Sequence, residues 1–219
     1  MSLTIQEARQ QVAELGKKML AGGLVAGTWG NISARVPQSD VVVITPSGMD
    51  YTKLRPSDIV VLDLTGKVLE GEHKPSSEAP LHLAIYRSRS DVAGVVHTHS
   101  EAATAFAVVR EPIPPVVEDA AMLVGGAVAV AEYALPGTEE LAKNVVTALG
   151  NRYAVLMANH GLVGVGRHVE EAFTVCQVVE KAAKIYALAR NLGEPQIIPE
   201  QDVLTLSQVY RHSYGQPKK

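Results

Sequence analysis

The stretch Asp91-Val-Ala-Gly-Val-Val-His-Thr-His-Ser100 is an apolar run that ends in two histidines one residue apart. A short, valine-rich run of this kind is typical of a buried strand. Successive side chains of a strand point to opposite faces, so His97 and His99 point the same way and can reach one point at its end. The run therefore predicts a core strand that carries two ligands of a divalent metal. A catalytic zinc ion usually takes a third protein ligand, which must come from elsewhere.

The best candidate for the third ligand is His160. It lies in Asn159-His160-Gly161, where one apolar run breaks and a second begins, and a histidine at such a break is partly exposed and can be aimed. His82 lies among the apolar residues of an expected helix, so we interpret it as a core histidine whose hydrogen bonds are satisfied. The weaker candidates are His73, His168 and His212.

A further motif, Lys74-Pro-Ser-Ser-Glu-Ala-Pro-Leu-His-Leu-Ala-Ile-Tyr86, begins as extended chain and continues as an amphipathic helix headed by Glu78. One interpretation is a simple helix start, with Ser76 or Ser77 as the cap and an acid in the first turn. The other is functional, because N–H groups at a helix N-terminus beside two hydroxyls can bind phosphate and a neighbouring carboxylate can act as a base. The spacing alone leaves both interpretations open.

Two glycine-containing turns offer similar groups. Gly27-Thr-Trp-Gly-Asn-Ile-Ser33 follows an expected helix and leads into a strand, and Ile44-Thr-Pro-Ser-Gly-Met49 closes a run of valines. Each provides exposed N–H groups and a side-chain donor, Asn31 in the first and Ser47, next to Gly48, in the second. Neither turn has the glycine spacing of a nucleotide-binding loop.

Together these segments resemble the class II aldolase/adducin family, and most closely its L-fuculose-1-phosphate aldolase branch. The resemblance rests on five motifs in order, G-T-W-G-N-I-S, I-T-P-S-G, K-P-S-S-E, V-V-H-T-H and N-H-G, and runs from about Gln6 to the last helix. It implies an α/β chain with a three-layer α/β/α fold around a mixed, mainly antiparallel sheet. It also implies a homotetramer with active sites at the subunit interfaces.

The resemblance assigns roles to individual residues. Glu78 matches an acid that lies on the metal at rest and then serves as the base. The implied reaction is the reversible, zinc-dependent cleavage of a phosphorylated ketose such as L-fuculose 1-phosphate. It yields dihydroxyacetone phosphate and an aldehyde such as lactaldehyde through a metal-stabilised enediolate. The matched zinc ligands, for one Zn²⁺ per subunit, are His97, His99 and His160, and the matched phosphate-binding positions are Asn31, Ser47, Gly48, Ser76 and Ser77.

One position departs from the fuculose-phosphate pattern. In that branch a tyrosine, donated across a subunit interface, protonates the departing aldehyde oxygen, but the matching place here holds Asp119. A carboxylate there resembles the epimerase branch, where an aspartate of the neighbouring subunit is an acid or base, although Glu118 and Asp119 also read as an ordinary solvated acidic pair. Tyr214 resembles a residue of the family's mobile tail and is a further candidate proton donor.

Three functions therefore stay open. The first is the aldolase. The second is another zinc enzyme on the same scaffold, a pentulose-5-phosphate 4-epimerase or a sugar-phosphate dehydratase or decarboxylase. The third, more remote, is a non-catalytic adducin-like interaction module, which predicts lost metal ligands.

Composition bears on the number of domains, on the class of binding partner and on the location in the cell. With 219 residues and 47% hydrophobic content, the chain can form one domain over residues 1–219, to which we assign a mobile C-terminal tail from about residue 200. A net charge of -3 without basic runs gives no sign of nucleic-acid binding. No signal peptide or long apolar span is present, so we expect a cytoplasmic protein that does not bind membranes. The single cysteine, Cys176, is interpreted as core packing.

The pattern along the chain also predicts the elements. Strands come both as close neighbours and separated by helices, which favours a mixed, mainly antiparallel sheet between helical layers. Helices are expected over residues 4–21, 78–89, 102–109, 138–149 and 169–192. Besides the histidine strand, strands are expected near residues 31–35, 41–45, 59–63, 67–69 and 128–131 and on both sides of His160.

Overall fold

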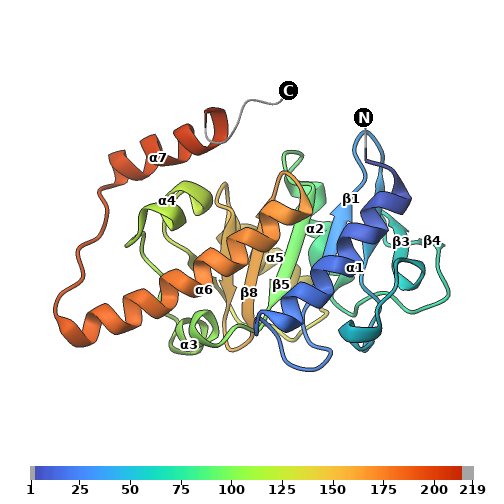
Figure 1. The fold of residues 1–219 in the computed structure, drawn as a ribbon, viewed down its shortest axis with the longest axis horizontal. Helices are drawn as coiled ribbons and strands as arrows, with labels where there is room; N and C mark the ends of the chain where they lie inside the picture. Colours follow the sequence, from blue (N-terminus) through green and yellow to red (C-terminus); the bar gives the residue numbers. More distant parts are fainter. Residues whose placement is uncertain (1–2, 214–219) are drawn as a thin grey trace.

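The computed structural model describes residues 3–213, and eight strands of this part form one sheet (Figure 1). They are β1 (Asn31–Arg35), β2 (Val41–Ile44), β3 (Val60–Asp63), β4 (Val68–Glu70), β5 (Gly94–Thr98), β6 (Ala129–Ala131), β7 (Ala154–Met157) and β8 (Gly161–Gly166). Their spatial order is β4-β3-β2-β1-β5-β8-β7-β6. All neighbouring pairs are antiparallel except β6 and β7, which are parallel. This confirms the predicted mixed, mainly antiparallel sheet.

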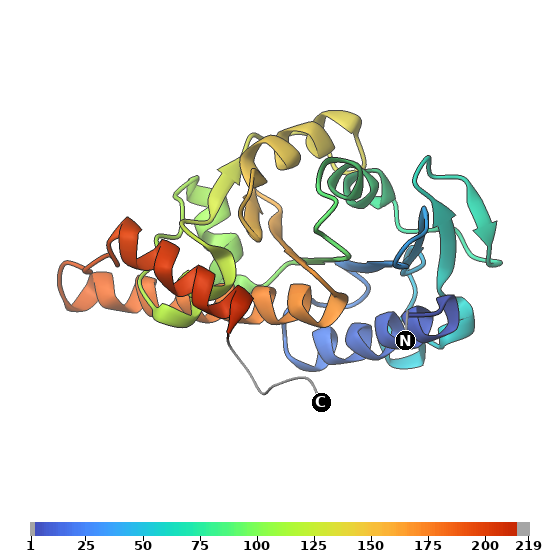
Figure 2. The same cartoon turned by 90° about the horizontal axis from the view of Figure 1, so that it is seen from above.

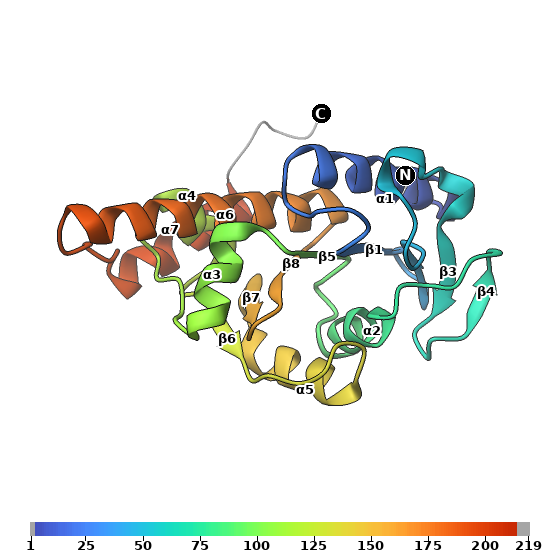
Figure 3. The same cartoon turned by 90° about the horizontal axis from the view of Figure 1, so that it is seen from below.

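Helices cover both faces of the sheet. Helices α1 and α6 lie along one face and α2 and α5 along the other, as the views from above and below show (Figures 2 and 3). Helix α3 packs beside α6 and strands β7 and β8. The helices are α1 (Ile5–Ala21), α2 (Ala79–Ser88), α3 (Glu101–Val109), α4 (Glu118–Val124), α5 (Glu139–Leu149), α6 (Val169–Leu192) and α7 (Glu200–His212). The predicted three-layer α/β/α architecture is therefore confirmed.

The histidine strand β5 lies inside the sheet, between β1 and β8. All five of its residues are buried, as expected for a strand that is covered on both faces. In the antiparallel register Asn31 of β1 lies opposite His97, and Leu162 of β8 lies opposite Thr98. The pairing thus brings three sequence motifs to one end of the strand.

The start of α1 illustrates how local sequence sets an element boundary. Thr4 is the N-cap residue, and its hydroxyl accepts a hydrogen bond from the backbone N–H of Glu7 at 3.2 Å. The Glu7 carboxylate accepts in return from the backbone N–H of Thr4 at 2.8 Å. This reciprocal pair satisfies two N–H groups that the first turn leaves unpaired, so the helix begins where the sequence predicts.

Two helices were not expected. Helix α4 includes the acidic pair Glu118 and Asp119, and ends at Gly125, which has φ 78°. Helix α7 occupies the segment expected as a tail and packs against α4 with Val203 and Ser207 buried. The mobility of the tail and the single-domain organisation stay predictions.

No helix among residues 3–213 combines the length and the apolar content that a bilayer crossing requires.

Candidate active site

Three histidines from two neighbouring strands converge at one end of the sheet. His97 is in β5, His99 directly follows it, and His160 lies in the turn between β7 and β8. The Nε2 atoms of His97 and His99 are 2.9 Å apart, and one ligand nitrogen from each of the three rings lies within 4.8 Å of the others. The pairing of β5 with β8 therefore unites the two histidine motifs.

A close backbone approach shapes the His160 turn. Asn159 has a left-handed φ of 56°, and the backbone N–H of His160 donates to the carbonyl oxygen of Met157 at 3.0 Å. A Cβ atom on Gly161 would lie 2.3 Å from the carbonyl oxygen of Thr98 and 3.2 Å from the ring of His97. Glycine is therefore required after His160 because the next strand passes directly beside β5.

The protonation state of His97 is fixed by its neighbour strand. Its Nδ1 lies 3.0 Å from the carbonyl oxygen of Leu162. A carbonyl only accepts, so Nδ1 carries a hydrogen, and in the neutral ring Nε2 then keeps its lone pair. Burial lowers the pKa of His97 to about 4, and burial also lowers the pKa of His99 and of His160. The rings are neutral near pH 7, which is the form that binds metal.

Glu78 faces these histidines from the start of α2. Its Oε2 lies 3.2 Å from Nε2 of His97 and its Oε1 lies 3.5 Å from Nε2 of His160. The residue is 6% exposed, and Oε1 has no hydrogen-bond partner. Burial by itself raises the pKa of Glu78, but His97, His160 and the Asn31 amide outweigh it, so the pKa lies below its usual value.

This set of groups fits a cation. The lone pair of His97 Nε2 and the carboxylate of Glu78 are both acceptors, and two buried acceptors at 3.2 Å repel each other unless a positive charge lies between them. Three neutral imidazoles with one open position form the ligand set of a catalytic divalent metal. His97, His99 and His160 could therefore hold such an ion, with Glu78 beside it.

The side chains behind Glu78 explain two other motif residues. Asn31 donates from Nδ2 to Glu78 Oε2 at 2.8 Å, so this amide faces the carboxylate. A second hydrogen on Nδ2 remains, so the predicted contact of Asn31 with a phosphate stays a prediction. His82 is fully buried and contacts Asn31 Oδ1 and the Ser33 hydroxyl. The interpretation of His82 as a satisfied core histidine is confirmed.

The two segments predicted to bind phosphate lie side by side. The backbone N–H of Ser47 donates to the carbonyl oxygen of Lys74 at 2.9 Å, and that of Ser76 donates to the carbonyl oxygen of Thr45 at 3.0 Å. Ser47, Gly48 and Ser77 are exposed, and Gly48 has φ 67°. These small, exposed residues lie on the two segments that the hydrogen bonds hold together, and Ser77 directly precedes Glu78.

Ser76 and Ser77 can be interpreted either as the start of a helix or as ligands of a phosphate. Glu78 itself is the N-cap residue of α2, and Ser76 Oγ accepts from the backbone N–H of Glu78 at 3.2 Å. Ser76 therefore supports the helix start. Ser77 has an exposed position, and its assignment to phosphate stays a prediction.

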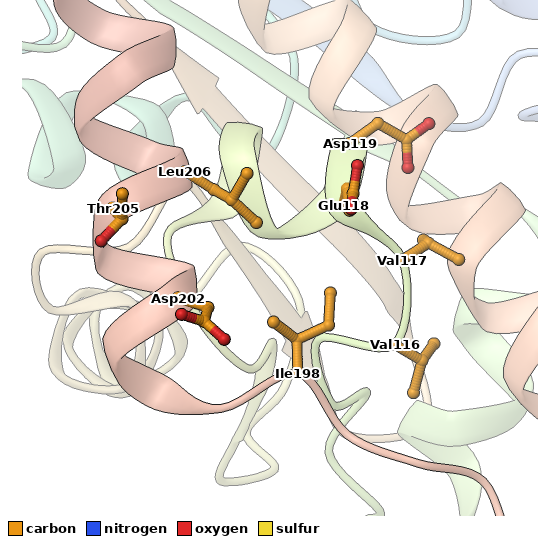
Figure 4. A pocket seen from close by; sticks show the side chains of 8 residues that line it. All are labelled: Val116, Val117, Glu118, Asp119, Ile198, Asp202, Thr205 and Leu206. Atoms are coloured by element: carbon orange, nitrogen blue, oxygen red, sulfur yellow. The ribbon is translucent and has the colours of Figure 1, made fainter.

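Asp119 lies apart from the histidine cluster within one chain. It is in the first turn of α4 and forms an ion pair with Lys181 of α6. Its carboxylate also accepts a hydrogen bond from the backbone N–H of Ala120 at 2.9 Å. It lines a cavity of about 820 Å³ between α4 and α7, together with Ile198 and Asp202 (Figure 4). Its predicted role across a subunit interface stays a prediction, and Tyr214 lies outside the described residues.

One residue beside the histidines carried no signal in the sequence. Trp29, the single tryptophan of the chain, is 66% exposed, and its ring stacks near that of His99 with centroids 5.9 Å apart. The turn motif indicated donors for an anion, and only the fold brings this turn to His99. By contrast, the spacing of Glu78, His82 and Tyr86 by four residues could have indicated that they share one helical face.

The comparisons with known proteins agree with this geometry. The model of the "Class II Aldolase and Adducin N-terminal domain" family matches residues 10–187. The 5-deoxy-D-ribulose 1-phosphate aldolase of Bacillus thuringiensis serovar kurstaki is 40% identical over 98% of this chain and 100% of its own. The 5-methylthioribulose-1-phosphate/5-deoxyribulose-1-phosphate aldolase of Rhodospirillum rubrum is 35% identical over 94% of this chain and 92% of its own.

A solved structure is similar over the same length. An L-fuculose 1-phosphate aldolase superposes with a TM-score of 0.90 at 40% identity, over 94% of this chain and 96% of that one. The predicted family resemblance is thus confirmed by sequence and by fold. The chain belongs to the class II aldolase and adducin family.

Proposed function

We propose that this protein is a zinc-dependent aldolase that reversibly cleaves a phosphorylated ketose into dihydroxyacetone phosphate and an aldehyde. The observation that carries the proposal is the buried carboxylate of Glu78, which has one oxygen without a partner and lies beside three converging neutral imidazoles. A base next to a Lewis-acid site is what removal of a proton adjacent to a carbonyl requires.

The residues divide this chemistry between them. When bound, the metal supplies a Lewis acid that stabilises negative charge on the substrate oxygens. Glu78 accepts the carbon-bound proton with its free Oε1, while Asn31 holds Oε2. Ser47, Gly48, Ser76 and Ser77, with the second Nδ2 hydrogen of Asn31, bind the phosphate and place the adjacent carbon beside Glu78. Zinc is the favoured ion because three imidazoles are among its usual ligand sets.

The substrate is a ketose phosphorylated at carbon 1. Relatives and a solved structure that match nearly the whole chain are named for 5-deoxyribulose 1-phosphate, 5-methylthioribulose 1-phosphate and L-fuculose 1-phosphate. In cleavage each gives dihydroxyacetone phosphate, and the aldehydes differ. We propose 5-deoxyribulose 1-phosphate and L-fuculose 1-phosphate as the first substrates to test.

The decisive experiment assays dihydroxyacetone phosphate release from these two substrates and from ribulose phosphates, with zinc content measured by elemental analysis. An aldolase releases dihydroxyacetone phosphate from at least one of them, and chelation stops the release. Epimerised or dehydrated product without dihydroxyacetone phosphate would overturn the proposal in favour of the other enzymes on this scaffold. A metal-free, inactive chain would favour the interaction module.

We propose that Asp119 reaches the site of a neighbouring subunit and gives a proton to the departing aldehyde oxygen, with Tyr214 as a second candidate. Asp119 supports this role by its position at the start of α4, with its side chain 42% exposed. The Asp119→Asn variant should slow bond cleavage more than exchange of the carbon-bound proton. Equal slowing of both steps would count against the assignment.

A homotetramer in the cytoplasm is part of the same proposal. Large apolar side chains are exposed at the ends of two helices, which is typical of surfaces that other subunits cover. They are Val108 and Val109 of α3 and Ile185, Leu188 and Leu192 of α6. Light scattering should give four times the mass of the chain, and a monomer at active concentrations would refute this part of the proposal.

A further inference from the structure

Five buried polar side chains form a continuous row from Glu78 into the space between β1 and α2. Glu78, His82 and Tyr86 are four residues apart, so they lie on one side of α2. Asn31 and Ser33 are two residues apart, so they point to the same face of β1. All five are at most 6% exposed. The helix row and the strand row face each other and hydrogen-bond across the gap.

The donors in this row can be assigned in turn. The carboxylate of Glu78 only accepts, so Asn31 donates to it from Nδ2 at 2.8 Å and turns Oδ1 toward His82 Nε2 at 2.5 Å. His82 therefore donates from Nε2. Burial lowers the pKa of His82 to about 3, so the ring has a single hydrogen.

The remaining links follow from that assignment. His82 Nδ1 has no hydrogen, so it accepts from the Ser33 hydroxyl at 2.6 Å. The hydroxyl of Ser33 has then used its only hydrogen, so Tyr86 donates to it at 2.8 Å. Every hydrogen bond in the row thus points toward Glu78, and the one that Ser33 donates to Nδ1 also fixes the ring of His82.

We propose that His82 is a positioning residue that acts through Asn31 and determines which oxygen of Glu78 is held and which is free for the substrate. This inference rests on the proposed role of Glu78 as the base. The two ends of an amide have nearly the same shape, so Asn31 could turn over without a steric clash. A turned amide would direct its oxygen at the carboxylate, and Glu78 would rotate away from its position beside His97. The donor on His82 prevents this.

The expected loss of rate follows from the displacement of the Glu78 carboxylate. The bond from Asn31 leaves Glu78 Oε1 free beside His160, and only a carboxylate in that rotation can meet the substrate carbon. Loss of an outer partner of this kind typically costs about 10- to 100-fold in rate. Of the residues proposed to bind the phosphate, only Asn31 belongs to the row, so the KM should change much less than kcat.

Two amide substitutions at position 82 form the test. His82→Gln is long enough to place a donor where Nε2 lies, whereas His82→Asn reaches only the place of Nδ1. Both are measured for exchange of the carbon-bound proton of dihydroxyacetone phosphate with deuterium, for metal content and for Tm. We expect a fall of about 10- to 100-fold in kcat for Asn, KM within about twofold, full metal content, and recovery of most of the rate by Gln.

Two further variants separate positioning from stability. Leu83→Ala removes a buried side chain from the same helix, next to Gly66 on the β3–β4 turn, and should lower the Tm without lowering kcat. Ser33→Ala removes the bond that fixes the ring of His82 and is a small change, so it tests the row even if His82→Asn does not fold. It should lower kcat about 3- to 10-fold with an unchanged KM.

The outcomes distinguish the two proposals. If the natural protein does not exchange the proton, the proposed function fails and this inference fails with it. If the natural protein exchanges the proton and His82→Asn and Ser33→Ala do so at its rate, the aldolase stands and the positioning role is wrong. A third result would also overturn the inference. If His82→Asn loses its metal, or if its KM rises by as much as its kcat falls, and His82→Gln does not recover the rate, the row has only a structural role.

Discussion

His97 donates its Nδ1 hydrogen to the carbonyl oxygen of Leu162, a residue of the neighbouring strand, at 3.0 Å. The bond keeps the ring in one tautomer and directs Nε2 toward His99 and Glu78. The same strand pairing that builds the centre of the sheet therefore prepares His97 as a ligand for the proposed metal.

Removing this ring should remove the metal. We expect His97→Ala to lose bound zinc and to lower cleavage at least about 10³-fold, because a Lewis acid contributes several kcal/mol to such a reaction. Elemental analysis and a cleavage assay check this. His168→Ala, at the exposed N-cap of α6, is the matched control and should keep both metal and activity. A fully active, metal-free His97→Ala protein would refute the ligand assignment.

Replacing the base should leave the metal in place. Glu78→Gln has the same shape but takes up no proton, so proton exchange into dihydroxyacetone phosphate should fall about 10²- to 10⁴-fold while zinc content stays unchanged. The measurement is deuterium incorporation followed by NMR. Exchange at the natural rate in this variant would remove Glu78 from the role of base.

Acid should destabilise the metal-free protein through its buried histidines. Burial lowers the pKa of His82 to about 3 in the folded state, against about 6.5 for an exposed histidine. Between these values the unfolded chain binds the extra proton, so the stability is complete above pH 6.5 and falls as the pH decreases. The loss is about 1.4 kcal/mol per pH unit for this group.

His82→Gln has no such group, so its free energy of unfolding should fall less steeply between pH 6 and 4, by about 1.4 kcal/mol per unit. Urea unfolding of both proteins in the presence of a chelator measures the two slopes. Equal slopes would show that His82 is not held neutral in the fold.

The turn after His160 should not tolerate a side chain. In Gly161→Ala the new Cβ would meet the carbonyl oxygen of Thr98 at 2.3 Å, so β8 must move away from β5 and His160 with it. We expect a loss of about 1–3 kcal/mol in the free energy of unfolding and much weaker zinc binding. Gly193→Ala, where nothing lies within 4 Å, is the control and should change neither. Normal zinc affinity in Gly161→Ala would contradict the proposed close approach.

The tryptophan should report on the metal. Because the ring of Trp29 stacks near that of His99, binding of Co²⁺ to the metal-free protein should quench its emission, with a midpoint equal to that of metal binding. A fluorescence titration measures this, and His99→Ala should abolish the response. Quenching of equal size in that variant would place the responsive metal elsewhere.

The sequence was sufficient for the features that depend on local pattern. The apolar run in residues 91–100 predicted β5, and the alternation of side chains along a strand predicted the direction of both histidines. The break around His160 predicted the turn that carries the third. The capping residues Thr4 and Glu7 placed the start of α1. Each of these signals lies within a few residues of the chain. Over such a short distance the periodicity of the backbone determines which way the side chains point.

Features that depend on distant partners could not be predicted in this way. The seven-residue helix α4 is too short to be stable alone, so it has no clear signal of its own. Helix α7 does carry local signals, an acidic first turn after Pro199 and a basic last turn, but its packing against α4 depends on the fold. The contact of Asn31 with Glu78 requires the register of β1 beside β5. A turn that looked suited to phosphate therefore also carries an amide for the carboxylate.

The place of the three histidines in the chain has a mechanical consequence. Everything from Ser100 to Asn159, including α3, α4, β6, α5 and β7, forms a loop whose ends meet at His99 and His160. An ion that binds there only in the folded state would stabilise the fold by joining the two ends of this long loop. Metal supply would then govern how long the protein survives heat and proteases as well as how fast it turns over.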